Sequence, residues 1–473
     1  MYKNHHYILQ HKCCLDLKQP IIVGVSGGAD SLYLLDVLWR LKYPLVVVHI
    51  NHLLRTSAGD DELLVQREAE ARGLEYRVNR KNALEFAHEQ KIAVEEAART
   101  IRYQYLYQEA EVSGAQAVAV GHTADDQVET VLMHLLRGAG TAGLRGMSYR
   151  ALPNTWSEQI PLVRPLLGVW REEILNYLDQ QGIIPTLDET NRDTKYFRNR
   201  IRHELLPVLR NYNPSIRQVV HRMADVLRGD YEIIEQTVDD TWSSLVLDNA
   251  PGYLRMRGDY FRKQTQGLQR LLIRKAVAHL RPDLRDVDYE AIERVLLFLE
   301  KKSRGQVDVV GGLSFLIEGD SIWLARDEVD LPIDAWPQIG SESMVHLNVP
   351  GEYRLEAGWM IKTKWVDQKA PVGETLPENR FFAWLDGDRL EIPLAVRWRI
   401  AGERFKPAGM EGHMIKISDL MINIKLPERA RSRWPLVVSG NEVVWIPGYR
   451  IADGYQAGSA SRRVVLIELL QQA

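Results

Sequence analysis

The chain has 473 residues, of which 45% are hydrophobic and 26% are charged. This length exceeds what one hydrophobic core supports and predicts two to four domains, and the composition is that of a globular protein rather than a disordered or fibrous one. The formal net charge of −3 neither favours nor excludes a nucleic-acid partner, because a basic patch can lie within a nearly neutral total.

The cysteine content and hydropathy exclude further classes. The two cysteines, Cys13 and Cys14, are adjacent, which excludes a disulfide framework and any Cys-x-x-Cys metal or redox motif. The sequence shows no secretory signal and no apolar run of transmembrane length. We therefore expect a cytoplasmic protein with no membrane partner.

A short motif, Ser26-Gly27-Gly28-Ala29-Asp30-Ser31, separates two apolar runs. The run at 21–25 predicts a buried strand, and the run at 32–38 has the spacing of a helix face. A glycine pair at such a junction lets an anion approach the backbone N–H groups at the start of a helix. The serines add hydroxyl donors, and the Asp30 carboxylate is a candidate ligand for Mg²⁺. The motif lacks the lysine of the Walker loop and the third glycine of the dinucleotide loop.

Strand and helix patterns alternate over the first two hundred residues. After the loop helix we expect a strand at 44–50, a helix at 59–72, a strand at 74–78, a helix at 94–112 and a strand at 115–121. This alternation predicts an α/β fold with a doubly wound, mostly parallel sheet. Ligands of such sheets bind beyond the carboxyl ends of the strands, so the loops after residues 25, 50 and 120 should face one crevice.

Polar side chains concentrate on those loops. His49 ends the second strand, where a hydrogen-bonded structural role is the ordinary one for a histidine. His122, Asp126 and Glu129 follow the fourth strand, and the two acids share a helix face because they are three residues apart. Asp125 and Asp126 are also typical helix-capping residues. We favour a site for Mg²⁺ or an ammonium group over capping alone.

Two basic motifs complement the acidic one. Arg99 and Arg102 lie three apart on one side of the helix expected at 94–112, where pairing with Glu95 and Glu96 is the simpler interpretation. A later segment, 197–202, contains Arg198, Arg200 and Arg202. These arginines suit bidentate phosphate binding, or they are an ordinary basic helix start.

The ordered motifs SGGADS, HINHLLR, EEAARTIRY, HTADDQVET, RPLL and DETN with FRNRIR resemble the bacterial tRNA(Ile)-lysidine synthetases, a family of N-type (PP-loop) ATP pyrophosphatases. The resemblance covers about residues 20–205. It implies an ATP-dependent ligase that uses L-lysine to convert the wobble cytidine of tRNA(Ile) with a CAU anticodon to lysidine, so that the tRNA reads AUA. The family commonly shows Asp-His-Gly-Leu-Arg where this chain has Asn51-His52-Leu53-Leu54-Arg55, so a metal role for Asn51 is doubtful.

Roles follow for the site residues. The ATP site is expected to comprise Ser26, Gly27, Gly28, Ala29, Asp30, Ser31 and His49, with Asp30 and Asp126 near Mg²⁺. The expected catalytic residues are Asp30, Arg102, His122, Asp126 and Glu129; the last three would bind the lysine ammonium groups or act as general base. Lysine carboxylate, ATP phosphates or tRNA would contact Arg99, Arg102, Arg198, Arg200 and Arg202.

Two other functions remain open at this point. The first is another PP-loop ATP pyrophosphatase that acts on tRNA, such as a 2-thiolation enzyme, but those enzymes need paired cysteines that Cys13 and Cys14 do not match. The second is a nucleotide-binding or tRNA-binding scaffold without catalysis, against which the intact acidic and basic motifs argue.

The sequence predicts three domains: 1–215, catalytic; 216–333, mostly helical and facing tRNA; and 334–473, a β-rich tRNA-binding domain. Helical spacing marks 216–246, 268–276 and 292–299, and 306–325 resembles two strands. A stretch at 331–338 resembles a linker, and strands are expected within 345–365 and 381–400. The RIAGERF and WIPGYR segments of the last domain also resemble the lysidine synthetases.

A basic stretch lies in the last domain. Between 397 and 433 there are nine Lys or Arg residues against four acids. Such a stretch suits a phosphate backbone. The expected tRNA contacts are Arg397, Arg399, Arg404, Lys406, Lys416, Lys425, Arg429, Arg431 and Arg433. Whether the protein forms a homodimer is left open.

Overall fold

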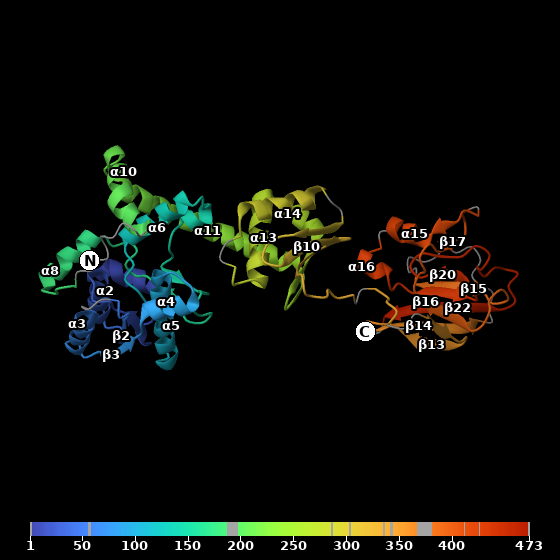
Figure 1. Cartoon of the computed structure of the whole chain (residues 1–473), viewed down its shortest axis with the longest axis horizontal. Helices are drawn as coiled ribbons and strands as arrows, with labels where there is room; N and C mark the ends of the chain where they lie inside the picture. The colour runs from blue at the N-terminus through green and yellow to red at the C-terminus, as the bar shows by residue number, and fades with distance from the viewer. Residues whose placement is uncertain are drawn as a thin grey trace. The chain divides into compact units, whose positions relative to one another are not determined.

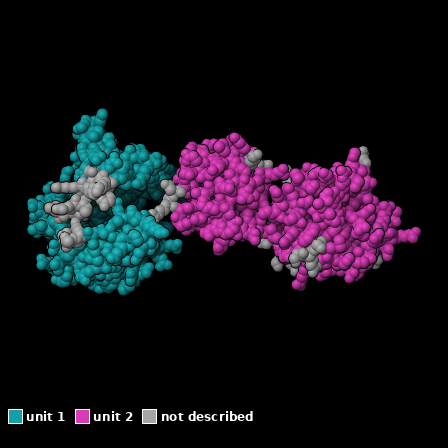
Figure 2. Space-filling view, viewed as in Figure 1, with its two compact units in different colours: residues 1–237 teal, residues 238–473 magenta. Residues whose placement is uncertain are grey.

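The computed structural model describes residues 2–54, 58–186, 197–284, 287–301, 304–333, 336–340, 344–366, 381–410, 412–424 and 426–471. The DETN motif at 188–191, Arg55 and Lys425 therefore lie outside the described residues. The chain divides into two compact units, 1–237 and 238–473 (Figure 2). The division into three domains stays a prediction.

The first unit is built on a six-stranded sheet in the order β3-β2-β1-β4-β6-β5. The edge strand β3 and its neighbour β2 are labelled in Figure 1. Its strands are β1 (Ile21–Gly24), β2 (Leu45–Asn51), β3 (Glu75–Arg80), β4 (Ala117–Ala119), β5 (Arg150–Ala151) and β6 (Leu162–Val163). Every neighbouring pair is parallel except β5–β6. The predicted α/β class with a mostly parallel sheet is confirmed.

The helices of this unit either cover the two faces of the sheet or pack beyond it. They are α1 (Tyr2–Tyr7), α2 (Ala29–Arg40), α3 (Ala58–Glu70), α4 (Ala83–Gln90), α5 (Val94–Val112), α6 (Ala124–Leu136), α7 (Thr141–Leu144), α8 (Arg171–Gln181), α9 (Phe197–Arg200) and α10 (Leu206–Tyr212), with π-helical turns at Ile8–Lys12 and Ile201–Leu205. Alternate strand residues enter different cores: Ile21 packs with α2 and α8, whereas Ile22 packs with α5. The carboxyl ends of β1, β2 and β4 thus meet at one edge.

The long helix α11 (Ile216–Leu245) leads into the second unit. A five-stranded sheet follows in the order β7-β8-β11-β10-β9, made of β7 (Val246–Ala250), β8 (Tyr253–Arg257), β9 (Gly305–Asp308), β10 (Leu313–Glu318) and β11 (Ser321–Arg326). Its helices are α12 (Gly258–Arg262), α13 (Gln266–Leu280) and α14 (Tyr289–Lys301). The expectation of two strands in 306–325 is wrong, because three are present.

The rest of the chain is β-rich, as predicted. Two sheets have the orders β12-β16-β19-β20-β21 and β13-β14-β22-β15, and β17 pairs with β18. The strands are β12 (Met344–Leu347), β13 (Gly351–Arg354), β14 (Trp359–Val366), β15 (Phe382–Asp386), β16 (Leu394–Arg397), β17 (Arg404–Phe405), β18 (Ile415–Lys416), β19 (Leu436–Ser439), β20 (Glu442–Ile446), β21 (Arg450–Ile451) and β22 (Val464–Gln471). Short helices α15 (Ile417–Asn423) and α16 (Glu428–Arg431) complete it. Within the described ranges, no helix is long and apolar enough to span a membrane.

Candidate active site

The loop between β1 and α2 is braced by its own hydroxyl groups. The backbone N–H of Ser26 donates to Ser31 Oγ at 3.1 Å, and the Ser31 hydroxyl donates to the Gly28 carbonyl at 2.9 Å. Gly28 is the N-cap of α2 and supplies no side chain to satisfy the first N–H groups of that helix. The loop therefore offers a preformed cradle with open donors for an anion.

Two glycines are required by this geometry. Gly27 has φ +87°, a left-handed conformation that disfavours a side chain. Gly121, just beyond β4, approaches the loop so closely that a Cβ would lie 2.9 Å from the backbone oxygen of Asp30. The segment after β4 thus lies against the backbone of the first turn of α2, as the predicted crevice requires.

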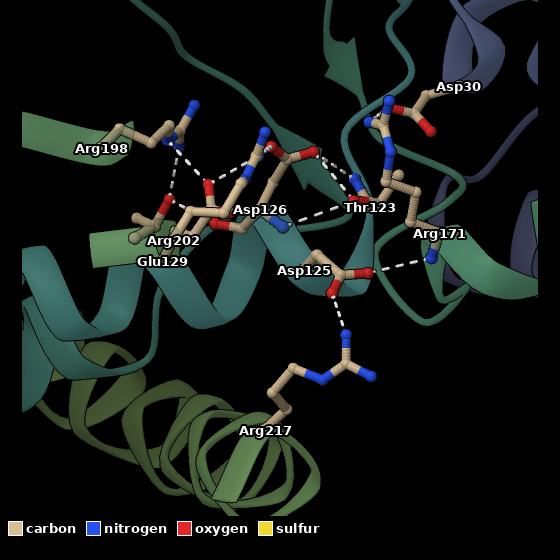
Figure 3. A network of polar contacts seen from close by, with 10 residues as sticks. Asp30, Thr123, Asp125, Asp126, Glu129, Arg171, Arg198, Arg202 and Arg217 are labelled. Atoms are coloured by element: carbon tan, nitrogen blue, oxygen red, sulfur yellow. Dashed lines mark hydrogen bonds and ion pairs between the residues drawn. The ribbon is translucent and has the colours of Figure 1, made fainter. Parts of the chain in front are cut away.

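Asp30 sits in the first turn of α2 and has one engaged oxygen (Figure 3). Its Oδ2 accepts from Nη1 of Arg171 at 3.0 Å, while Oδ1 is buried and has no hydrogen-bond partner among the described residues. Burial raises the pKa of Asp30 to about 6, although Arg171 opposes the shift. A buried, uncompensated carboxylate oxygen beside an anion cradle fits Mg²⁺, which usually binds one or two carboxylates together with substrate phosphates.

Asp126 caps the helix on which it lies. Its Oδ2 accepts from the Thr123 backbone N–H at 2.8 Å and from the Thr123 hydroxyl at 3.0 Å, in a capping box at the start of α6. Burial raises the pKa of Asp126, but the charge of Arg198 and the Thr123 hydrogen bonds bring it below its ordinary value. Asp126 therefore caps α6, as one of the two interpretations predicted, and its carboxylate remains ionised.

Glu129 is occupied by arginines. Only 1% of its side chain is exposed, and it accepts from Nε and Nη2 of Arg202 at 2.6 and 3.0 Å. Arg198 adds an ion pair at 3.4 Å and donates to the Thr130 hydroxyl at 2.9 Å. Arg200 points elsewhere, with its Nε 3.5 Å from Glu204. The structure thus brings Arg198 and Arg202 to the acidic pair, but not Arg200 (Figure 3).

The histidines differ in their surroundings. His122 Nδ1 is buried with no partner among the described residues, and burial lowers the pKa of this imidazole to about 3, so the ring is neutral at pH 7. His49 is buried and donates from Nδ1 to the Val25 carbonyl at 2.8 Å. This hydrogen bond connects the end of β2 to the residue that follows β1.

Sequence reasoning gave no role to His52. Both of its ring nitrogens are buried and lack a partner among the described residues. Burial, followed by the charge of Arg102, lowers the pKa of His52 to about 4. Arg102 and Arg99 are exposed on α5, and Arg99 lies 4.8 Å from the ring centroid of Tyr103. The residues after β2 therefore reach the vicinity of the basic motif.

Asn51 has a structural explanation. Its side-chain N–H groups donate to the Glu62 carboxylate at 3.1 Å and to the Ala58 carbonyl at 3.2 Å, and its oxygen accepts from Leu53 N–H. An aspartate could not donate these bonds. Leu53 has φ +55°, which explains why glycine suits this position in the family's usual pattern.

The basic stretch at 397–433 splits into engaged and open side chains. Arg397 is buried in a two-bond ion pair with Glu403, and Lys406 lies 3.0 Å from Asp453. Arg429 donates to both Glu318 oxygens at 2.7 Å, and Arg431 donates to the Leu426 carbonyl at 2.8 Å.

Apart from Arg431, whose partner is a backbone carbonyl, four members of the stretch have no ion pair among the described residues: Arg399, Arg404, Lys416 and Arg433. Arg404 and Lys416 are exposed and face each other in the β17–β18 pair. These four side chains form the part of the stretch that is open to an anionic partner.

Sequence reasoning also missed Arg171 and the partners of Asp125. Asp125 does not cap its own helix; it accepts from the Arg171 backbone N–H at 2.9 Å and from Arg217 at 2.7 Å (Figure 3). An isolated arginine at a helix start has no spacing signal, so only the fold reveals that Arg171 reaches the loop.

Comparison with known proteins finds similarity along nearly the whole chain. The family model of the PP-loop domain matches residues 3–209, and that of the TilS substrate C-terminal domain matches 394–468. The tRNA(Ile)-lysidine synthase of Dehalococcoides mccartyi is 32% identical over 95% of this chain and 94% of its own. That of Geobacter sulfurreducens is 31% identical, covering 95% and 93%, and that of Symbiobacterium thermophilum is 32% identical, covering 98% and 96%. The chain therefore belongs to the tRNA(Ile)-lysidine synthase family of ATP-dependent ligases.

Proposed function

We propose that this protein ligates L-lysine to C2 of the wobble cytidine of tRNA(Ile) with a CAU anticodon. In the first step, the cytidine O2 attacks the α-phosphate of ATP and pyrophosphate leaves. The deprotonated ε-amine of lysine then attacks C2, and AMP leaves with the former O2. The product is lysidine, and the modified tRNA reads AUA as isoleucine.

The single observation that supports this proposal most is the proximity of an anion cradle and an acid–arginine cluster. The 26–31 loop offers open backbone donors, and Arg171 and Asp125 connect Asp30 to the helix that carries Asp126 and Glu129. One part suits a polyphosphate, and the other suits a zwitterionic amino acid. Their connection fits a reaction in which both substrates meet at one base.

Mg²⁺ would be held by Asp30 through its unpartnered oxygen. The ion would neutralise charge on the phosphates during transfer. Asp126 is less suited, because its Oδ2 already accepts two hydrogen bonds from Thr123, and its proposed share in the metal site is confined to Oδ1.

Lysine would bind at the cluster through complementary charges. The Asp126 side chain is 16% exposed and that of Glu129 only 1%, so Asp126 is the carboxylate that we assign to an ammonium group. Glu129 then orients Arg198 and Arg202, whose guanidinium groups would receive the lysine carboxylate or a phosphate. A pKa of about 3 makes the neutral His122 ring a weak base, so we assign it to orient the attacking amine by a hydrogen bond and not to take its proton.

Arg102 and Arg99 extend the positive charge on α5 and would contact phosphates or the tRNA. In the second unit, we assign tRNA backbone contacts first to Arg399, Arg404, Lys416 and Arg433. Arg397 and Arg429 would need to break ion pairs before they could bind a phosphate. Electrostatic contacts of this kind supply affinity rather than sequence selection.

A tRNA 2-thiolation activity is the second candidate, and the cysteines argue against it. Cys13 is fully buried, and burial raises the pKa of its thiol to about 12, so it is protonated at neutral pH. The other cysteine, Cys14, adjoins it before β1.

The test is AMP release from ATP by the purified protein. With Mg²⁺, L-lysine and a tRNA(Ile) transcript with a CAU anticodon, we expect AMP and lysidine in equal amounts, and no AMP when either lysine or tRNA is omitted. Absence of AMP from the complete mixture would refute the proposal. A sulfur-dependent AMP release would instead indicate the thiolation class.

A further inference from the structure

Arg171, the first residue of α8, directs its charge at the nucleotide loop. Its Nη1 lies 3.0 Å from Asp30 Oδ2, and 43% of the side chain is exposed. The other guanidinium nitrogens have no hydrogen-bond partner within the described part of the chain, which leaves a planar donor group available beside the cradle. Arginine suits such a place because its fork of donors matches phosphate oxygens as well as carboxylates.

The backbone of Arg171 is fixed independently of its side chain. Its N–H donates to Asp125 Oδ2 at 2.9 Å, and Asp125 Oδ1 accepts from Arg217 at 2.7 Å (Figure 3). The start of α8 is therefore attached to α6 by a bond that any residue at position 171 would retain. A substitution of Arg171 therefore removes the guanidinium group and keeps the backbone hydrogen bond to Asp125.

Helix α8 and the residues after it also contact α2 and the 26–31 loop. Tyr177 donates to Asp36 of α2 at 2.5 Å, and the Thr186 backbone N–H donates to the Gly27 carbonyl at 3.0 Å. The loop is thus contacted from the start of α8 through Arg171 and from beyond its end through Thr186. This arrangement holds the guanidinium group at a defined distance from the site of the phosphates.

We propose that Arg171 is a phosphate-binding residue of the ATP site. It neutralises Asp30 while the site is empty, and it transfers its hydrogen bonds to the phosphate chain when Mg²⁺ takes that carboxylate. The inference rests on the proposed function in assigning ATP to the 26–31 loop. It adds a positive group, from α8, to a loop that contains no lysine or arginine of its own.

The test is direct ATP binding by the full-length protein without tRNA or lysine, measured by calorimetry with Mg²⁺ and again with EDTA. We expect Arg171→Ala to raise the Kd for ATP at least tenfold with Mg²⁺ and by a smaller factor with EDTA, where Asp30 keeps the guanidinium group, and Arg171→Lys to recover part of the loss with Mg²⁺. Arg40→Ala is the matched control, because Arg40 also connects α2 to α8, through Asp36 and Gln181, and its side chain is 38% exposed. The control should bind ATP within twofold of the unmodified protein.

Thermal unfolding of each variant checks its fold, and Arg171→Gln, which keeps the side-chain stem, replaces the alanine variant if that one unfolds. A Kd with Mg²⁺ within twofold of the unmodified protein would overturn the proposal. So would a rise in the KM for lysine with no change in the KM for ATP, since the guanidinium group would then serve the amino acid. The Kd for ATP does not depend on lysidine formation, whose failure would appear as absent AMP release by the unmodified protein.

Discussion

Asn51 and Glu62 are joined by a hydrogen bond of 3.1 Å in which the amide donates and the carboxylate accepts. Glu62 also binds Arg80, and that hydrogen bond lowers the pKa of Glu62 below its ordinary value. The Asn51–Glu62 hydrogen bond connects the end of β2 to α3, next to the residues after β2 that include His52. A departure from the family's usual aspartate thus coincides with a specific partner in this chain.

Replacement of that amide tests the relationship. Asn51→Asp places two buried carboxylates at hydrogen-bond distance, so we expect a loss of about 2 kcal/mol in the free energy of unfolding. Denaturant unfolding at pH 7 measures it. Glu62→Gln in the same chain restores a donor, and the double variant should be more stable than the sum of the single effects predicts. Strict additivity would show that the two side chains do not interact.

Asp36 provides a second test through pH. It is 1% exposed and accepts from Arg40, Arg72 and Tyr177. Burial alone would raise the pKa of Asp36. The hydrogen bonds from the three donors outweigh burial, so the pKa of Asp36 lies below its ordinary value. A carboxyl group with a depressed folded-state pKa adds stability above its unfolded-state pKa and loses it as the pH falls.

We therefore expect Asp36→Asn to cost about 3 kcal/mol at pH 7, because two arginines lose their anionic partner. Below the ordinary carboxyl pKa, near 4, the difference between this variant and the unmodified protein should shrink. Urea unfolding at several pH values measures both effects. A difference that stays constant down to pH 3 would contradict the assigned ion pairs.

Asp30 allows the two halves of the proposed reaction to be separated. Asp30→Ala removes the unpartnered oxygen that we assign to Mg²⁺, so adenylation of the tRNA should be abolished. Binding of tRNA, measured by filter retention, should remain nearly unchanged because the basic side chains of the second unit are untouched. If tRNA binding is lost as well, the loop has another role.

The exposed β17–β18 pair tests the tRNA-binding surface. The double variant Arg404→Ala/Lys416→Ala should weaken tRNA binding severalfold and reduce the slope of log K against log salt by about 0.7–0.9 for each lost contact. Lys406→Ala is the control, because that lysine is exposed but paired with Asp453. An unchanged salt slope in the double variant would exclude these two side chains from the contact.

The spacing of apolar residues predicted those helices and strands whose buried face is visible in the local sequence. The bounds of α5 agree with the expected 94–112, because apolar spacing and a glycine after the helix mark it. The strands β7 and β8 were not anticipated, since β7 is mostly exposed and shows no alternating apolar face.

The site shows where sequence reasoning ends. The nine basic residues at 397–433 were weighed by charge, yet Arg429 pairs with Glu318, which is 111 residues away. Likewise Arg171 meets Asp30 across 141 residues. A count of local charge cannot distinguish a neutralised arginine from an open one, because the neutralising partner comes from the tertiary fold.

The contact between Gly121 and the backbone of Asp30 has a genetic consequence. One added methyl group at position 121 would press on the nucleotide loop at 2.9 Å while every charged side chain of the site stays in place. Strain at this contact lowers the free energy of unfolding, so the variant should lose its structure at a lower temperature than the unmodified protein. Gly121→Ala is therefore the change by which a heat-sensitive allele should be sought, and under the proposed function it would switch off AUA decoding in growing cells.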